Sequence, residues 1–111
     1  MASDGWEAVI AADALLPNSL TRVDAGGQPA LVYRLGAAIF AISNRCTHAG
    51  MVLDRAQVQA VGADAIVTCP AHGSRFGLSD GKVRRGLATQ PLVSYEAREV
   101  DGHIELRPRS G

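Results

Sequence analysis

Short apolar runs, broken every few residues by Gly, Asp, Asn or Pro, are the feature of this chain that most restricts its fold. Runs rich in Val, Ile, Leu, Tyr and Phe at this spacing are typical of a small all-β sandwich or barrel. The strands predicted from them are residues 6–10, 20–24, 29–35, 37–43, 57–61, 65–68, 92–100 and 103–107. Asp101-Gly102 is the strongest hairpin signal, because this pair suits the positive φ angles of a two-residue turn. A further hairpin is expected to turn at Asp80-Gly81, and helix is expected to be scarce, with at most a turn or so at 11–16 and at 55–60.

Length and composition limit what such a chain can do. Its 111 residues suffice for one domain, and its 47% hydrophobic content supports a packed core. The 11 Lys and Arg residues balance the 11 Asp and Glu residues, which argues against nucleic-acid binding. The first residues resemble no secretory signal, and no apolar run approaches the length that spans a bilayer. We therefore expect a cytoplasmic protein with no membrane segment.

Two loops hold the residue types that carry chemistry. The first, predicted at about 44–54, contains Cys46-Thr47-His48, and the second, at about 68–77, contains Cys69-Pro70-Ala71-His72. Two thiolates and two imidazoles can bind a tetrahedral zinc ion or a 2Fe–2S cluster. Zinc fingers usually pair Cys with Cys and His with His, whereas each loop here mixes the two. A two-iron cluster explains that division better, because each loop then supplies a ligand to each iron.

The sequences Cys46-Thr47-His48-Ala49-Gly50 and Cys69-Pro70-Ala71-His72-Gly73-Ser74-Arg75-Phe76 resemble the ligand motifs of the Rieske iron–sulfur family. The likeness continues through Asp80-Gly81-Lys82-Val83 and the closing hairpin. It implies a single Rieske 2Fe–2S domain over residues 1–111, built as an antiparallel β sandwich with a small cluster-binding subdomain. It also implies one 2Fe–2S cluster, with Cys46 and Cys69 on one iron and His48 and His72 on the other. Neutral imidazole ligands raise the potential above that of all-cysteine clusters.

Residues beside the ligands are expected to tune the cluster. Gly50 and Gly73 leave room for the backbone to close around it and to aim amides at its sulfides. The resemblance further implies that the Ser74 hydroxyl donates a hydrogen bond to a bridging sulfide.

Three departures from the respiratory Rieske proteins point to a lower potential. Met51 and Ala71 stand where those proteins have a second cysteine pair, so the disulfide between the loops cannot form. Phe76 stands where that branch has a tyrosine that donates to a cysteine sulfur. We therefore expect a potential in the lower or middle part of the family range.

The resemblance implies an electron carrier with no substrate site of its own. It would be a monomeric ferredoxin that receives one electron from a flavin-dependent ferredoxin reductase and passes it to a terminal oxygenase through transient contacts. The alternative is a small Rieske subunit of a larger redox enzyme, such as a nitrite reductase-like complex. A zinc-stapled binding module is the third possibility.

Other polar and aromatic residues have simpler interpretations. His103 is expected to be a solvated turn residue, and Trp6 a core or edge anchor. Arg45, Arg75 and Arg84-Arg85 are expected to be solvated, with contact to an acidic partner as the less favoured alternative.

Overall fold

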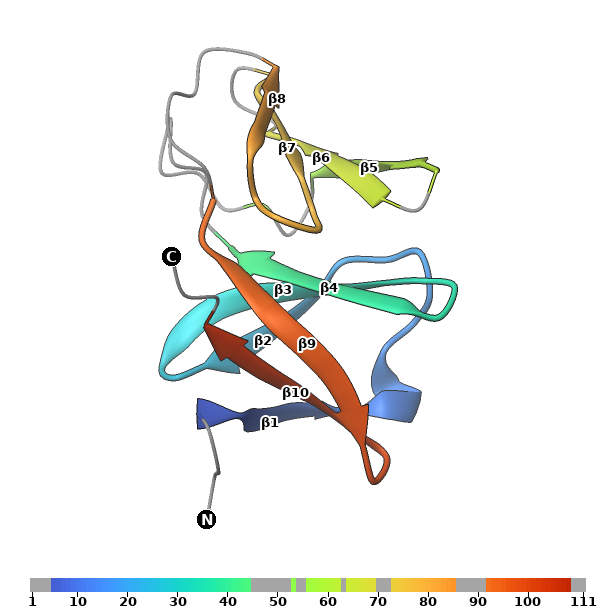
Figure 1. Cartoon of the computed structure of the whole chain (residues 1–111), viewed down its shortest axis with the longest axis vertical. Coiled ribbons are helices and arrows are strands. Elements are labelled where there is room, and N and C mark those ends of the chain that lie inside the picture. The colour runs from blue at the N-terminus through green and yellow to red at the C-terminus, as the bar shows by residue number, and fades with distance from the viewer. Residues whose placement is uncertain are drawn as a thin grey trace.

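The computed structural model describes residues 5–44, 53, 56–62, 64–69, 73–85 and 92–108, and most of them form β-strands (Figure 1). In chain order the elements are β1 (Glu7–Ala11), the 3₁₀ helix η2 (Ala12–Ala14), β2 (Thr21–Ala25), β3 (Gln28–Leu35), β4 (Ala38–Ser43), β5 (Gln57–Val61), β6 (Asp64–Thr68), β7 (Arg75–Gly77), β8 (Val83–Arg85), β9 (Ser94–Val100) and β10 (His103–Pro108). The all-β prediction is confirmed. The predicted helical turn at 55–60 is wrong at 57–60, where the chain pairs with β6 as part of β5.

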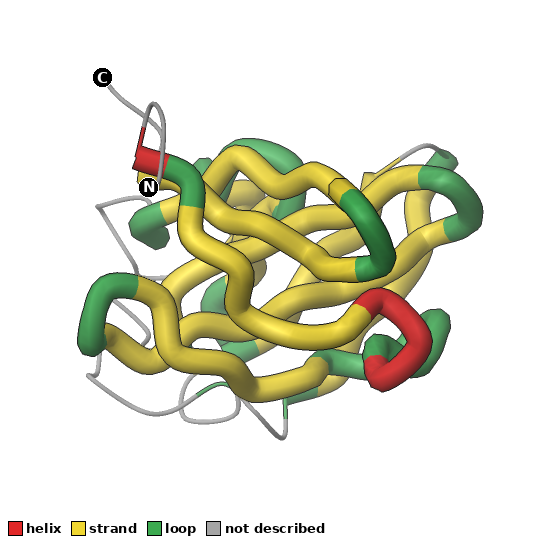
Figure 2. Tube along the Cα trace, turned by 90° about the horizontal axis from the view of Figure 1, so that it is seen from below, coloured by secondary structure: helices red, strands yellow, loops and turns green. Residues whose placement is uncertain are grey.

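The large sheet has six antiparallel strands in the order β1-β10-β9-β4-β3-β2. It curls so far that its two edge strands, β1 and β2, contact each other (Figure 2). The backbone N–H of Gly26, in the turn after β2, donates to the Glu7 carboxylate of β1 at 2.7 Å. The sheet thus folds over a core of its own, which contains Val32 of β3, Tyr95 of β9 and Leu106 of β10.

The small sheet has four antiparallel strands in the order β5-β6-β7-β8, and it is inserted in the chain between β4 and β9. It lies at one end of the long axis, above the large sheet in Figure 1. A second apolar core joins the two sheets, with Leu31, Tyr33 and Ile42 from the large sheet against Val67 and Phe76 from the small one. This arrangement is the predicted sandwich with an inserted subdomain.

Because β3 and β4 lie between these two cores, they are covered on both faces. Neighbouring residues of a strand point to opposite faces. Val32 therefore packs in the core of the large sheet, whereas Leu31 packs against the small sheet. Ala41 and Ile42 of β4 divide between the cores in the same way, although residues 38–40 are only half-buried.

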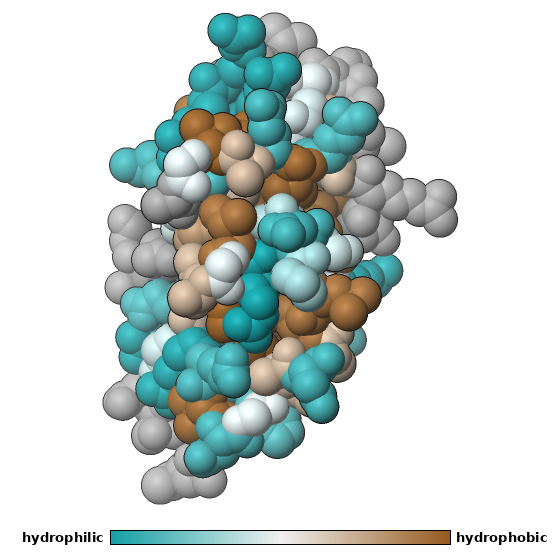
Figure 3. Space-filling view, turned by 90° about the vertical axis from the view of Figure 1, so that its right-hand side faces the viewer, coloured by the Kyte–Doolittle hydropathy of each residue, from teal (hydrophilic) through white to brown (hydrophobic). Residues whose placement is uncertain are grey.

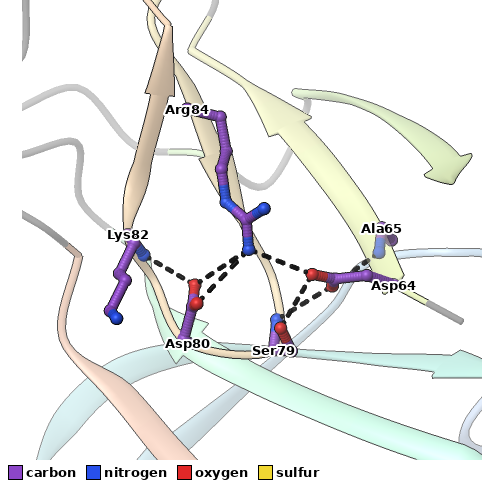
Figure 4. Close-up of polar contacts among 6 residues, drawn as sticks. All are labelled: Asp64, Ala65, Ser79, Asp80, Lys82 and Arg84. Carbon is purple, nitrogen blue, oxygen red and sulfur yellow. Dashed lines mark hydrogen bonds and ion pairs between the residues drawn. The ribbon is translucent and has the colours of Figure 1, made fainter.

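An ionic network braces the turn between β7 and β8 (Figure 4). The Arg84 guanidinium donates to the carboxylates of Asp64, at 3.2 Å, and Asp80, at 3.3 Å, and the Ser79 hydroxyl donates to Asp64 at 2.8 Å. Gly77 leaves room for this guanidinium, since a Cβ at that position would lie 2.6 Å from an Arg84 nitrogen. The network ties the start of β6 to the β7–β8 hairpin, and so holds together the sheet that carries the second predicted loop.

No helix among the described residues has the length and apolar character that crossing a membrane requires.

Candidate metal centre

The described residues include part of the predicted site. Four of its residues belong to them, namely Cys69, Gly73, Ser74 and Phe76. The other four, Cys46, His48, Gly50 and His72, lie outside the described residues, as do Met51 and Ala71. Within the described ranges, no three His, Cys, Asp or Glu side chains group as a metal site would need. The complete ligand set therefore remains a prediction from the sequence.

Cys69 follows β6 directly, and its side chain is buried in the core between the two sheets with 1% exposure. Its N–H donates to the Ser74 carbonyl at 2.7 Å, and the Gly73 N–H donates to the Cys69 carbonyl at 3.0 Å. These bonds close the 69–74 segment at its base. Gly73 has φ +75°, a backbone conformation that residues with a Cβ rarely adopt. The local backbone therefore gives a second reason for glycine at this position, beside the predicted need for room around the cluster.

Ser74 and Phe76 continue the chain into β7. Ser74 is fully buried, so its hydroxyl lies inside the protein and next to the base of the 69–74 segment. Phe76 is also fully buried, opposite Val67 and Val83 on the inner face of the small sheet. It belongs to the same apolar core as Cys69. Both positions suit the tuning roles that the sequence predicts.

Asn44 is a residue that the motif analysis missed. It is fully buried at the end of β4, and its side-chain oxygen accepts the N–H of Leu53 at 2.7 Å. This bond joins the two ends of the segment that contains Cys46 and His48. The available signal was an Asn directly after a strand, since Asn side chains often bond nearby backbone N–H groups in turns.

The side-chain nitrogen of Asn44 bears on whether this end of the protein suits a cluster. It is buried and has no hydrogen-bond partner among the residues that the structure describes. Such an orphaned donor costs about 1–3 kcal/mol. Thiolate and sulfide are hydrogen-bond acceptors, so a bound 2Fe–2S cluster is a group that this amide suits. Cys69 is buried beside this end, and the sequence supplies two thiols and two imidazoles as ligands. The residues present therefore fit a 2Fe–2S cluster.

His103 and Trp6, which were assigned simpler roles, behave as predicted. His103 is exposed at the β9–β10 turn, with its Nδ1 3.2 Å from the Asp101 carbonyl oxygen. Trp6 is half-buried beside the edge strand β1, and its ring lies 4.1 Å from the Arg98 guanidinium and 4.5 Å from that of Arg107. Such contacts stabilise by cation–π attraction. Trp6 is thus an edge anchor.

Comparisons with known proteins agree with this geometry. The anthranilate 1,2-dioxygenase ferredoxin subunit of Burkholderia cepacia is 29% identical over 101 residues, which are 91% of this chain and 90% of the relative. The solved ferredoxin of carbazole 1,9a-dioxygenase from Nocardioides aromaticivorans IC177 superposes with a TM-score of 0.82 at 29% identity, covering 96% of this chain and all of the other. A chain assigned as a nitrite reductase (NADPH) small subunit superposes with a TM-score of 0.79 over 91% of this chain and 96% of the other, but at 14% identity this shows a shared fold alone.

The family itself follows from a match to the Rieske [2Fe-2S] domain over residues 5–96, most of the chain. The cofactor that the match implies is a Rieske-type 2Fe–2S cluster. The chain belongs to the Rieske [2Fe-2S] domain family.

Proposed function

We propose that Cys46, His48, Cys69 and His72 hold the cluster, the cysteines on one iron and the histidines on the other. The buried Cys69 at the hydrogen-bonded base of its segment supports this assignment on the cysteine side. The bond between Asn44 and Leu53 supports it on the other, because it closes the segment that carries Cys46 and His48. When bound, a cluster of this type accepts and releases one electron.

The chain then serves as a ferredoxin, formed by a single Rieske domain over residues 1–111. It carries one electron from a flavin-dependent ferredoxin reductase to a terminal oxygenase, and the reaction on the substrate takes place in the oxygenase. The observation that carries this proposal is the 29% identity, over 91% of the chain, to the ferredoxin subunit of a dioxygenase. The proposed compartment is the cytoplasm, where reducing conditions keep Cys46 and Cys69 as thiols able to bind metal.

The exposed apolar surface favours a carrier that exchanges partners over a fixed subunit. Among the described residues, the large apolar side chains that are exposed are Leu16, Val61 and Val93, which come from three separate segments. In the face shown in Figure 3, apolar residues lie in several groups among hydrophilic ones. A permanent subunit interface is usually larger and more apolar, whereas transient redox contacts are small. We therefore propose a monomer with transient contacts.

The test is a reconstituted electron-transfer chain of NADH, a flavin-dependent ferredoxin reductase and cytochrome c as the final acceptor. We expect the rate of cytochrome c reduction to rise in proportion to the amount of holo-protein added. His72→Ala abolishes the effect, whereas the control His103→Ala keeps it, because His103 is an exposed turn residue. Equal rates with His72→Ala and wild type would contradict the proposal, as would cluster-containing protein that gives no acceleration.

A further inference from the structure

The charges of this protein are divided between its two ends, although they cancel overall. Residues 45–91, which include the small sheet and both predicted ligand motifs, contain six basic and three acidic residues. The rest of the chain contains five basic and eight acidic residues. Among the described residues, the small-sheet end carries four basic and two acidic side chains, whereas the large-sheet end carries four basic and seven acidic ones. The described part of the molecule therefore has a positive end and a negative end (Figure 1). The positive end is the one with the predicted cluster.

One row of the small sheet concentrates this positive charge. Gln57 of β5 lies opposite Thr68 of β6, Thr68 lies opposite Arg75 of β7, and Arg75 lies opposite Arg85 of β8. We call these four residues the polar row. Gln57, Arg75 and Arg85 are exposed, and the first three members line an open groove of about 410 Å³. The row contains no carboxylate.

The row also lies directly beside the second ligand segment. Thr68 immediately precedes Cys69, and Arg75 immediately follows Ser74. Their register therefore places the middle of the row at the base of the segment that the Cys69–Ser74 hydrogen bond closes. A partner bound at the row would lie next to the predicted cluster.

The arginines of this sheet differ in whether they have carboxylate partners. The pairing of β7 with β8 skips Arg84, because Phe76 pairs with Val83 while Arg75 pairs with Arg85. The guanidinium of Arg84 forms ion pairs with Asp64 and Asp80. Arg75 and Arg85 form no ion pair with any described residue. Like charges directly opposite each other in an antiparallel pair are destabilising. Two positive charges, those of Arg75 and Arg85, thus lie opposite each other without stabilising the fold of the described residues.

We propose that the polar row is the docking surface for a carboxylate-bearing face of the terminal acceptor protein, with Arg75 and Arg85 as the anchors. This inference rests on the proposed electron-carrier function. Arginine binds carboxylates through two parallel hydrogen bonds, and Gln57 and Thr68 supply neighbouring polar contacts. The positive end steers an acidic face toward the site at low salt, which raises the rate of encounter.

The test measures how fast dithionite-reduced holo-protein is oxidised in a stopped-flow instrument by acceptors of opposite charge. Ferricyanide, a trianion, stands in for the acidic acceptor, and tris(phenanthroline)cobalt(III), a trication, is the counter-probe. At about 50 mM salt we expect Arg85→Gln to slow oxidation by ferricyanide roughly threefold and Arg75→Gln/Arg85→Gln roughly eightfold, from the Coulomb energy of each lost charge with a trianion at about 10 Å in water, reduced by screening at that salt. At about 0.5 M salt the differences should nearly vanish through screening. Oxidation by the trication should become faster in both variants.

Arg22→Gln is the matched control, because it removes the same charge from an exposed site on β2 of the large sheet. We expect its ferricyanide rate to stay close to that of wild type. An equal slowing by Arg22→Gln would show an effect of net charge and overturn the proposal, as would an unchanged rate in the double variant. A slower reduction by the ferredoxin reductase with unchanged oxidation by ferricyanide would assign the row to the electron donor and also overturn it. Failure of the electron-carrier function is distinguishable, because wild-type protein would then show no signal from a reduced cluster and no oxidation to follow.

Discussion

Replacing Gly81 by alanine tests whether the β7–β8 turn fixes the small sheet to the segment that enters β9. Gly81 has φ +74°, and an added Cβ would lie 2.3 Å from the Leu92 carbonyl oxygen. The Gly81 N–H donates to the Gly77 carbonyl at 2.7 Å, and the Leu92 N–H donates to the Gly81 carbonyl at 2.7 Å. Because the group in the way is backbone, the chain has to move and both bonds are strained.

The size of the effect follows from two contributions. A residue with a Cβ at positive φ costs about 1 kcal/mol relative to glycine. Two backbone hydrogen bonds contribute about 1 kcal/mol each, so Gly81→Ala should lower the free energy of unfolding by about 3 kcal/mol. The matched control is Gly36→Ala, because Gly36 has φ +60° and nothing within 4 Å of the added Cβ. It should cost only the first contribution, about 1 kcal/mol.

The assay is thermal unfolding by far-ultraviolet circular dichroism at a fixed scan rate, with cluster loss followed by visible absorbance. In a chain of this length, 1 kcal/mol corresponds to about 4 °C in Tm. We therefore expect Tm to fall by about 4 °C in Gly36→Ala and by about 12 °C in Gly81→Ala, with earlier cluster loss in the latter. Equal Tm values for the two variants would refute the argument that the contact with Leu92 holds the sheets together.

Three further predictions concern Asn44, Tyr95 and Phe76. Asn44→Ala leaves the Leu53 N–H without its acceptor and should lower the free energy of unfolding by about 1–3 kcal/mol, measured in the same thermal scans; an unchanged Tm would contradict the role given to this bond. Burial, and then the charge of Glu7, raise the pKa of Tyr95 above 10.0, so folded protein keeps a proton that the unfolded chain loses. Stability should therefore fall as pH rises from about 10 toward the folded pKa, and Glu7→Gln should lower the midpoint of the phenolate absorbance titration, whereas an unmoved midpoint argues against the charge effect. Phe76→Tyr should raise the midpoint potential in a redox titration through a hydrogen bond to a cluster sulfur, and an unchanged potential would mean that the hydroxyl points away from it.

Local signals predicted most of the strands because their causes are local. Asp101 and Gly102 adopt the positive φ angles, 52° and 79°, that the Asp-Gly hairpin signal requires. Gly26 and Gly27 do the same in the turn between β2 and β3. The run at 37–43 does not alternate between apolar and polar residues, because β4 packs against a core on each face. Its continuous apolar pattern therefore reflects the inserted sheet that covers its second face.

Contacts between distant segments were not predictable in this way. The contact between β1 and β2 and the ion pair between Arg84 and Asp64 join residues whose proximity depends on the finished topology. Arg84 was expected to be solvated or to contact an acidic partner, but its partners are Asp64 and Asp80 of the same chain. The site shows the same limit, since the motif pointed to the ligands but not to the buried Asn44 that closes their segment.

The most direct test of the central claim is an electron paramagnetic resonance spectrum of the anaerobically purified protein before and after reduction with dithionite. A Rieske cluster on Cys46, His48, Cys69 and His72 predicts silence in the oxidised state and, on reduction, a signal with the low average g value of a cluster with mixed His and Cys ligands. Silence in both states, together with zinc in the metal analysis, would contradict electron transfer and leave a zinc-stapled binding module instead.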